Sequence, residues 1–116
     1  MVTGVQTCAL PISLVVPVEE VDQWVDADPE LLAHLNLVSH RIGLAVRAVW
    51  SPPRVALIIA GFEVPHLHLH VYPAWGLGDF DFRNAQIDPD QAELDRNADS
   101  LRAALREAGD GASVPE

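Results

Sequence analysis

The chain has 116 residues, 49% of them hydrophobic and 21% charged, and its formal net charge is −10. This length predicts one domain with a modest core. The 17 acidic residues outnumber the 7 basic ones, which argues against broad nucleic-acid binding because that needs cationic contacts to phosphates. No apolar run approaches the roughly 20 residues that span a bilayer, so we expect no membrane segment. The one cysteine, Cys8, cannot form an internal disulfide, which favours a cytoplasmic location.

The beginning of the chain differs from the rest. Residues 2–12 carry no charge, no hydrophobic periodicity and no signal-peptide pattern. They resemble the in-frame translation of a sequencing-library adapter. We therefore expect residues 1–13 to be an artefact, residues 2–12 to pack loosely, and native sequence to begin near Ser13 or Leu14. Without the upstream part, we expect the chain to be poorly soluble or inactive.

The next segment predicts a short strand followed by a long helix. Val15–Val18 is a short strand, and Pro17 ends it or places it at a sheet edge. Asp28 is a good N-cap, Pro29 suits the first helical position, and residues 31–49 keep three- and four-residue apolar spacing. We expect this helix to run to about Trp50, where two prolines stop it.

A nearly continuous apolar run, Val55–Phe62, predicts a central strand that is covered on both faces. Gly61 then turns the chain toward a second strand. Residues 74–82 form a loop with aromatic side chains that more often pack than bind ligands. Residues 89–108 predict a second helix that ends in a glycine-rich tail. The pattern indicates the α+β class, with an antiparallel sheet and helices on one side.

The most informative pattern is the alternation of His66, His68 and His70 with apolar residues. Side chains alternate between the two faces of an extended strand, so the three imidazoles share one face at spacings of about 6.6 Å. The opposite, apolar face can be buried. A face with three imidazoles is costly to keep for packing alone, so this pattern predicts a reactive site. His34 and His40 lie in the predicted helix without such partners, and we interpret both as surface or helix-packing residues.

The run from His66 to Tyr72 resembles the signature of the histidine triad (HIT) superfamily of nucleotide hydrolases and transferases. The preceding segment, residues 56–65, is similar to the strand and glycine turn that lead into this motif. The resemblance covers about residues 14–85, as a partial HIT-like domain, with residues 86–116 as a C-terminal helix and tail. Family members carry a further, upstream histidine, and its position falls on Ile12 here. The resemblance implies a nucleotide substrate, no cofactor and a homodimer.

The resemblance also implies a role for each histidine. His68 would attack the α-phosphate of a dinucleoside polyphosphate or a nucleoside phosphoramidate and form a nucleotidyl-histidine intermediate. His70 would donate a proton to a phosphoryl oxygen or to the leaving group, and His66 would orient the site. His70 and Glu63 occupy the family's phosphate-binding positions. Glu63 replaces the serine or threonine that is frequent there, and a carboxylate repels a polyphosphate unless it turns away, is protonated or binds a cation.

Two other classes of function remain open. Alternating histidines on a strand bind Zn²⁺ in several enzymes, and Glu63 could supply a further ligand if the turn before the triad rotates it. We nevertheless expect no metal, because the extra ligands are missing from the motif. The second alternative is a nucleotide-binding module without catalytic activity.

Overall fold

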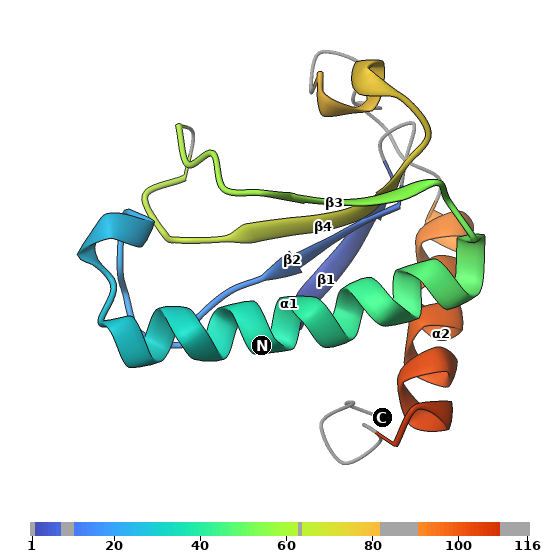
Figure 1. The fold of residues 1–116 in the computed structure, drawn as a ribbon, viewed down its shortest axis with the longest axis horizontal. Helices are drawn as coiled ribbons and strands as arrows, with labels where there is room; N and C mark the ends of the chain where they lie inside the picture. Colours follow the sequence, from blue (N-terminus) through green and yellow to red (C-terminus); the bar gives the residue numbers. More distant parts are fainter. Residues whose placement is uncertain (1, 8–10, 63, 82–90, 110–116) are drawn as a thin grey trace.

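A computed structural model describes residues 2–7, 11–62, 64–81 and 91–109, and shows one antiparallel sheet with two long helices (Figure 1). The α+β class and the placement of the helices on one side of the sheet are confirmed. Within the described ranges, no helix is both long enough and apolar enough to cross a membrane.

The sheet has the strand order β1-β2-β4-β3, and all neighbours are antiparallel. Its strands are β1 (Val2–Thr7), β2 (Pro11–Val15), β3 (Arg54–Ile58) and β4 (Leu69–Ala74). The strand predicted at residues 15–18 is wrong in position, because β2 ends at Val15. The expectation that residues 2–12 pack loosely fails at Ile12, which is only 3% exposed, and β1 in the same segment pairs with β2. An uncharged, extended segment can join an open sheet edge whatever its origin.

The position of β3 also differs from the prediction. Among the described strands, β3 lies at the edge of the sheet and β4 lies between β2 and β3. Leu57 on β3 is 50% exposed, and the side chain of Phe62, after the strand has ended, is 99% exposed. The apolar run from Val55 to Phe62 therefore does not mark a strand covered on both faces. Gly61 adopts a φ of 87°, a backbone conformation that favours glycine, where the chain turns back toward β4.

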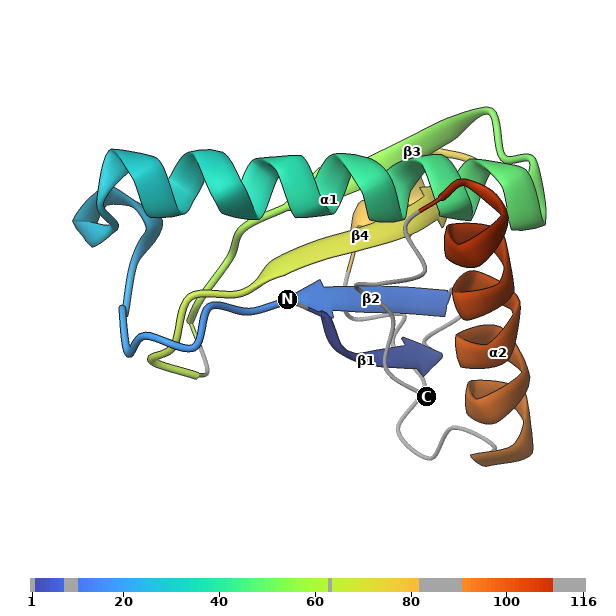
Figure 2. The same cartoon turned by 90° about the horizontal axis from the view of Figure 1, so that it is seen from below.

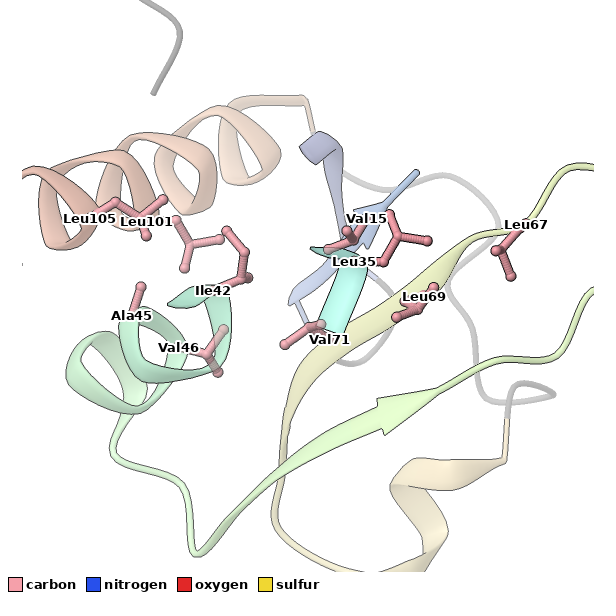
Figure 3. Packing of buried hydrophobic residues seen from close by; sticks show 10 residues of the cluster. All are labelled: Val15, Leu35, Ile42, Ala45, Val46, Leu67, Leu69, Val71, Leu101 and Leu105. Carbon is pink, nitrogen blue, oxygen red and sulfur yellow. The ribbon is translucent and has the colours of Figure 1, made fainter. Parts of the chain in front are cut away.

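The main core lies between the two helices and one face of the sheet, which we call the helix face. Helix α1 (Pro29–Trp50) begins after Asp28, as predicted, although the Asp28 side chain makes no capping hydrogen bond. Helix α2 (Gln91–Glu107) packs beside α1 at the end of the sheet (Figure 2). Figure 3 shows the buried residues that join these elements: Val15, Leu35, Ile42, Ala45, Val46, Leu67, Leu69, Val71, Leu101 and Leu105.

The opposite face of the sheet carries a second, smaller cluster. It consists of buried Ile12, Ala56, Tyr72 and Ala74, with Leu14 and Ile58 packed against them. The short helix η2 (Leu77–Phe80) follows β4, and the Phe80 ring lies 6.0 Å from the Tyr72 ring, measured between centroids. Leu14, His70 and Ile58 are direct cross-strand partners, so they share this second face. We call it the triad face.

Candidate functional site

The three histidines lie where the chain enters β4. Strand β4 begins at Leu69, so only His70 lies within a strand, and the prediction of one strand through all three residues is wrong in extent. The alternation is nevertheless present, since the three histidines are half-buried while Leu67 and Leu69 are buried in the main core. The Leu67 amide donates a 2.6 Å hydrogen bond to the Val21 carbonyl. This backbone contact holds the segment just before the start of β4.

Each imidazole donates one ring N–H to a backbone carbonyl. His66 Nε2 lies 3.0 Å from the Pro17 oxygen, His68 Nδ1 lies 2.7 Å from the His66 oxygen, and His70 Nδ1 lies 3.2 Å from the Ile58 oxygen. A carbonyl oxygen can only accept, so the ring nitrogen must be the donor in each contact. These contacts fix the orientation and the tautomer of each neutral ring.

The tautomer of His68 determines its chemistry. With the proton held on Nδ1, the neutral ring carries its lone pair on Nε2. No other hydrogen bond to His68 is found in the part of the chain that the structure describes. His68 therefore presents an oriented nucleophile that is half-buried, with part of its ring accessible to a substrate.

His68 and His70 form the centre of the site. Their ring centroids are 4.9 Å apart, and the ring planes meet at 64°, an edge-on arrangement. Burial lowers the pKa of His70 below its ordinary value of 6.5, the hydrogen bond to the Ile58 carbonyl raises it, and the nearby His68 lowers it. The net effect is a decrease, which favours the neutral ring of His70 when no substrate is bound.

This shift gives a prediction about pH. An NMR titration of the ring nitrogens should show His70 half-protonated below pH 6.5 in the ligand-free protein. Between the folded-state pKa of His70 and pH 6.5, the unfolded chain then binds more protons than the folded chain. The contribution of His70 to the free energy of unfolding is therefore complete above pH 6.5 and is lost as the pH falls through the folded pKa. A titration midpoint of His70 at or above pH 6.5 would show that burial does not control the pKa of this ring.

The other residues singled out in the sequence are not part of this cluster. His34 and His40 are exposed on α1, which packs on the helix face, so their interpretation as surface residues is confirmed. Glu63 lies outside the described residues. Within those residues, no group of three or more His, Cys, Asp or Glu side chains is arranged to hold a metal ion. The sequence did not predict the carbonyls of Pro17, Ile58 and His66 as hydrogen-bond acceptors of the histidine rings, because a backbone acceptor leaves no signal in the sequence.

Comparisons with known proteins identify the family and the fold of this chain. The HIT domain family matches residues 10–75, which is more than half of the chain. A histidine triad protein from Bradyrhizobium japonicum has a TM-score of 0.71 at 20% identity, and the match covers 90% of this chain and 82% of that protein. A histidine triad protein from Sinorhizobium meliloti has a TM-score of 0.62 at 18% identity, with 83% and 76% covered. These two likenesses concern the fold.

A third solved structure is slightly more similar in sequence. It is a HIT-like protein from Bartonella henselae described as involved in cell-cycle regulation, with a TM-score of 0.69 at 25% identity. The match covers 81% of this chain and 70% of that protein. The family match includes all three histidines and the strands that hold them, so the chain belongs to the HIT domain family.

Proposed function

We propose that the protein is a nucleotide hydrolase or nucleotidyl transferase that acts at an α-phosphate through a covalent intermediate on His68. The substrate is a dinucleoside polyphosphate or a nucleoside phosphoramidate. The observation that carries the proposal is the hydrogen bond from His68 Nδ1 to the His66 carbonyl, because it directs the lone pair on Nε2 away from the backbone. We place the protein in the cytoplasm, as a homodimer.

The reaction has two displacement steps. In the first, His68 Nε2 forms a bond to the α-phosphorus, and the bond from phosphorus to the leaving oxygen or nitrogen breaks. In the second, water attacks the same phosphorus, the bond from phosphorus to His68 Nε2 breaks and releases the nucleoside monophosphate, and the proton from water goes to the solvent or to His70. The backbone carbonyl of His66 accepts the hydrogen bond that holds the His68 ring, and the His66 ring donates a hydrogen bond to the Pro17 carbonyl. It is a positioning residue in this scheme.

The leaving group needs a proton in the first step, and His70 lies close enough to supply it. Its ring centroid is 4.9 Å from that of His68. In the ligand-free state the lowered pKa favours the neutral form of His70. A bound phosphate anion favours the charged imidazolium and raises this pKa. His70 thus gains its proton when substrate binds, and contacts the phosphate together with Glu63, provided that the Glu63 carboxylate is protonated or bound to a cation.

Intact-mass spectrometry with each substrate class, with and without EDTA, tests this proposal. We expect turnover that EDTA does not abolish and a mass increase of one nucleoside monophosphate that maps to His68. EDTA-sensitive turnover with stoichiometric zinc in the purified protein would instead identify a zinc hydrolase. Binding without turnover or adduct would identify a nucleotide-binding module without catalytic activity.

A further inference from the structure

The two segments that hold the triad and its hydrogen-bond acceptors contain acidic residues but no basic ones. Residues 11–30 include six acidic residues and residues 55–70 include one, and neither segment contains lysine or arginine. The chain has no lysine, and of the six arginines in the described ranges five belong to α1 and α2. The sixth, Arg54, begins β3 four residues before Ile58, about 13 Å along the strand. In the part of the chain that the structure describes, the triad thus lies in negative surroundings.

Five of these acidic residues belong to the connection between β2 and α1, residues 16–28. Two hydrogen bonds attach this connection to the triad segment. The His66 ring donates to the Pro17 carbonyl at 3.0 Å, and the Leu67 amide donates to the Val21 carbonyl at 2.6 Å. Figure 1 shows the connection at the end of the sheet where the chain enters β4. The acidic connection is therefore part of the surroundings of the site.

Glu19 and Glu20 lie between these two attachment points, and both are exposed. Within the described ranges, neither carboxylate takes part in a hydrogen bond or an ion pair. Along the chain they follow Pro17 by at most about 7 and 11 Å, and the Pro17 carbonyl accepts the hydrogen bond of the His66 ring. A charge acts across about 8–10 Å at ionic strengths of about 0.1–0.15 M. Both carboxylates therefore influence a charged group that binds beside His66.

We propose that Glu19 and Glu20 make the triad selective for nucleoside phosphoramidates whose leaving amine carries a second, positively charged group. This inference rests on the proposed function and narrows its substrate class. The leaving group of a dinucleoside polyphosphate carries negative charge on its further phosphates, so the two carboxylates repel it. They attract an ammonium group on the leaving amine instead. In a chain of net charge −10, the same preference acts on the approach of the substrate.

The leaving group departs to solvent, and the open end of the triad is at His66. On the His70 side, the triad face continues along β4, where Tyr72 is buried and the Phe80 ring lies 6.0 Å from its ring. On the His66 side the regular strand has not yet begun. The apolar surface beyond His70 suits the nucleoside. The leaving group accordingly extends past His66, toward the β2–α1 connection.

The surface beside His66 also offers apolar contacts to the leaving group. Val18, which directly follows Pro17, is 77% exposed, and Val64, two residues before His66, is 54% exposed. A short alkyl chain between the reacting nitrogen and a distal ammonium group removes such surface from water, which is favourable. A polyphosphate chain has no apolar part that could do so. The acidic and the apolar side chains thus favour the same leaving group, an alkyl amine with a positive charge.

The first displacement balances for such a substrate. The lone pair on His68 Nε2 forms the bond to the α-phosphorus, and the bond from phosphorus to the amide nitrogen breaks. The electron pair stays on that nitrogen, which takes the proton of His70 and leaves as an amine. The distal ammonium group keeps its charge and takes no part in bond making. Glu19 and Glu20 are therefore specificity-determining residues, whose effect follows the charge of the leaving group.

Three phosphoramidates of one nucleoside test the proposal. Their leaving amines are ethylenediamine, propylamine and β-alanine, which have similar length and end in an ammonium, a methyl and a carboxylate group. We expect kcat/KM of the wild-type chain to fall in this order, by about 10–100-fold from first to last at an ionic strength of about 0.01 M. A dinucleoside polyphosphate should rank with the carboxylate. At about 1 M salt, which screens exposed charges, the range should be much smaller.

The double variant Glu19→Gln, Glu20→Gln tests whether the preference arises in the β2–α1 connection. It retains the size of both side chains and should narrow the range to about threefold or less. Asp95→Asn combined with Glu107→Gln is the matched control, because it also removes two exposed carboxylates, from α2 on the helix face, and should leave the range unchanged. Measuring every variant on the same substrates cancels the difference in basicity between the three amines.

A wild-type chain that hydrolyses the three phosphoramidates equally well would overturn the selectivity, and so would a range that the double variant leaves unchanged. In both cases the turnover itself would still support the proposed function. The melting temperature shows whether the double variant is folded, and each single variant should give about half of the narrowing on a logarithmic scale. The absence of turnover and of a nucleotidyl adduct with all four substrates would instead refute the proposed function and, with it, the selectivity.

Discussion

Replacing His68 with alanine is expected to lower turnover by on the order of 10³–10⁶-fold, because the reaction then lacks its nucleophile. The change should leave the fold intact. The His68 residue is half-buried on the triad face rather than part of the core, and its one hydrogen bond within the described residues goes to a backbone carbonyl two positions away. The measurement is kcat with a phosphoramidate and with a dinucleoside polyphosphate, together with the melting temperature of the same sample.

His40→Ala provides the matched control. His40 is exposed on α1, which packs on the opposite face of the sheet, so its removal should change neither turnover nor stability appreciably. The role assignment is wrong if His68→Ala retains near-normal turnover while His66→Ala or His70→Ala abolishes it. In that case the attacking ring nitrogen belongs to another member of the triad.

Replacing Leu69 with alanine is expected to lower the free energy of unfolding by about 2–5 kcal/mol. Leu69 is fully buried, lies on the central strand β4 and is part of the core between the sheet and the helices. The truncation leaves a cavity that the flanking strands can close only in part. Because small domains are stable by only about 5–15 kcal/mol, this loss is a large fraction of the total.

Leu77→Ala is the control for this prediction, since Leu77 is 90% exposed and its truncation leaves no cavity. Urea unfolding of both variants and the wild type, at one fixed protein concentration, measures the difference. The backbone of Leu69 joins His68 to His70, so Leu69→Ala should also reduce turnover at temperatures where it remains folded. A loss below about 0.5 kcal/mol, the range of surface substitutions, would mean that this position is not part of the core.

The common face of the triad could be predicted because the two-residue period of an extended chain depends on the backbone alone. The half-buried histidines and the buried leucines between them follow that period even where the regular strand has not yet begun. Helix α1 was equally predictable, since Asp28, Pro29 and the two prolines after Ser51 mark its ends locally. Both features depend on residues close together in the sequence.

The features that could not be predicted depend on contacts between distant residues. The apolar run of β3 suggested burial on both faces, but composition does not report how many strands lie beside a given strand, and here β3 has one neighbour among the described strands. The hydrogen bonds from His66 to Pro17 and from His70 to Ile58 join residues 49 and 12 positions apart. Their acceptors are backbone carbonyls, which every residue carries.

The stereochemical course at the α-phosphorus tests the central claim most directly, because it does not require the intermediate to accumulate. A substrate made chiral at this phosphorus with sulfur and oxygen isotopes is hydrolysed by the full chain, and the configuration of the product is determined. Attack by His68 followed by attack by water inverts the centre twice, so the predicted result is net retention. Net inversion would mean that water attacks the substrate directly, and would contradict a covalent intermediate on His68.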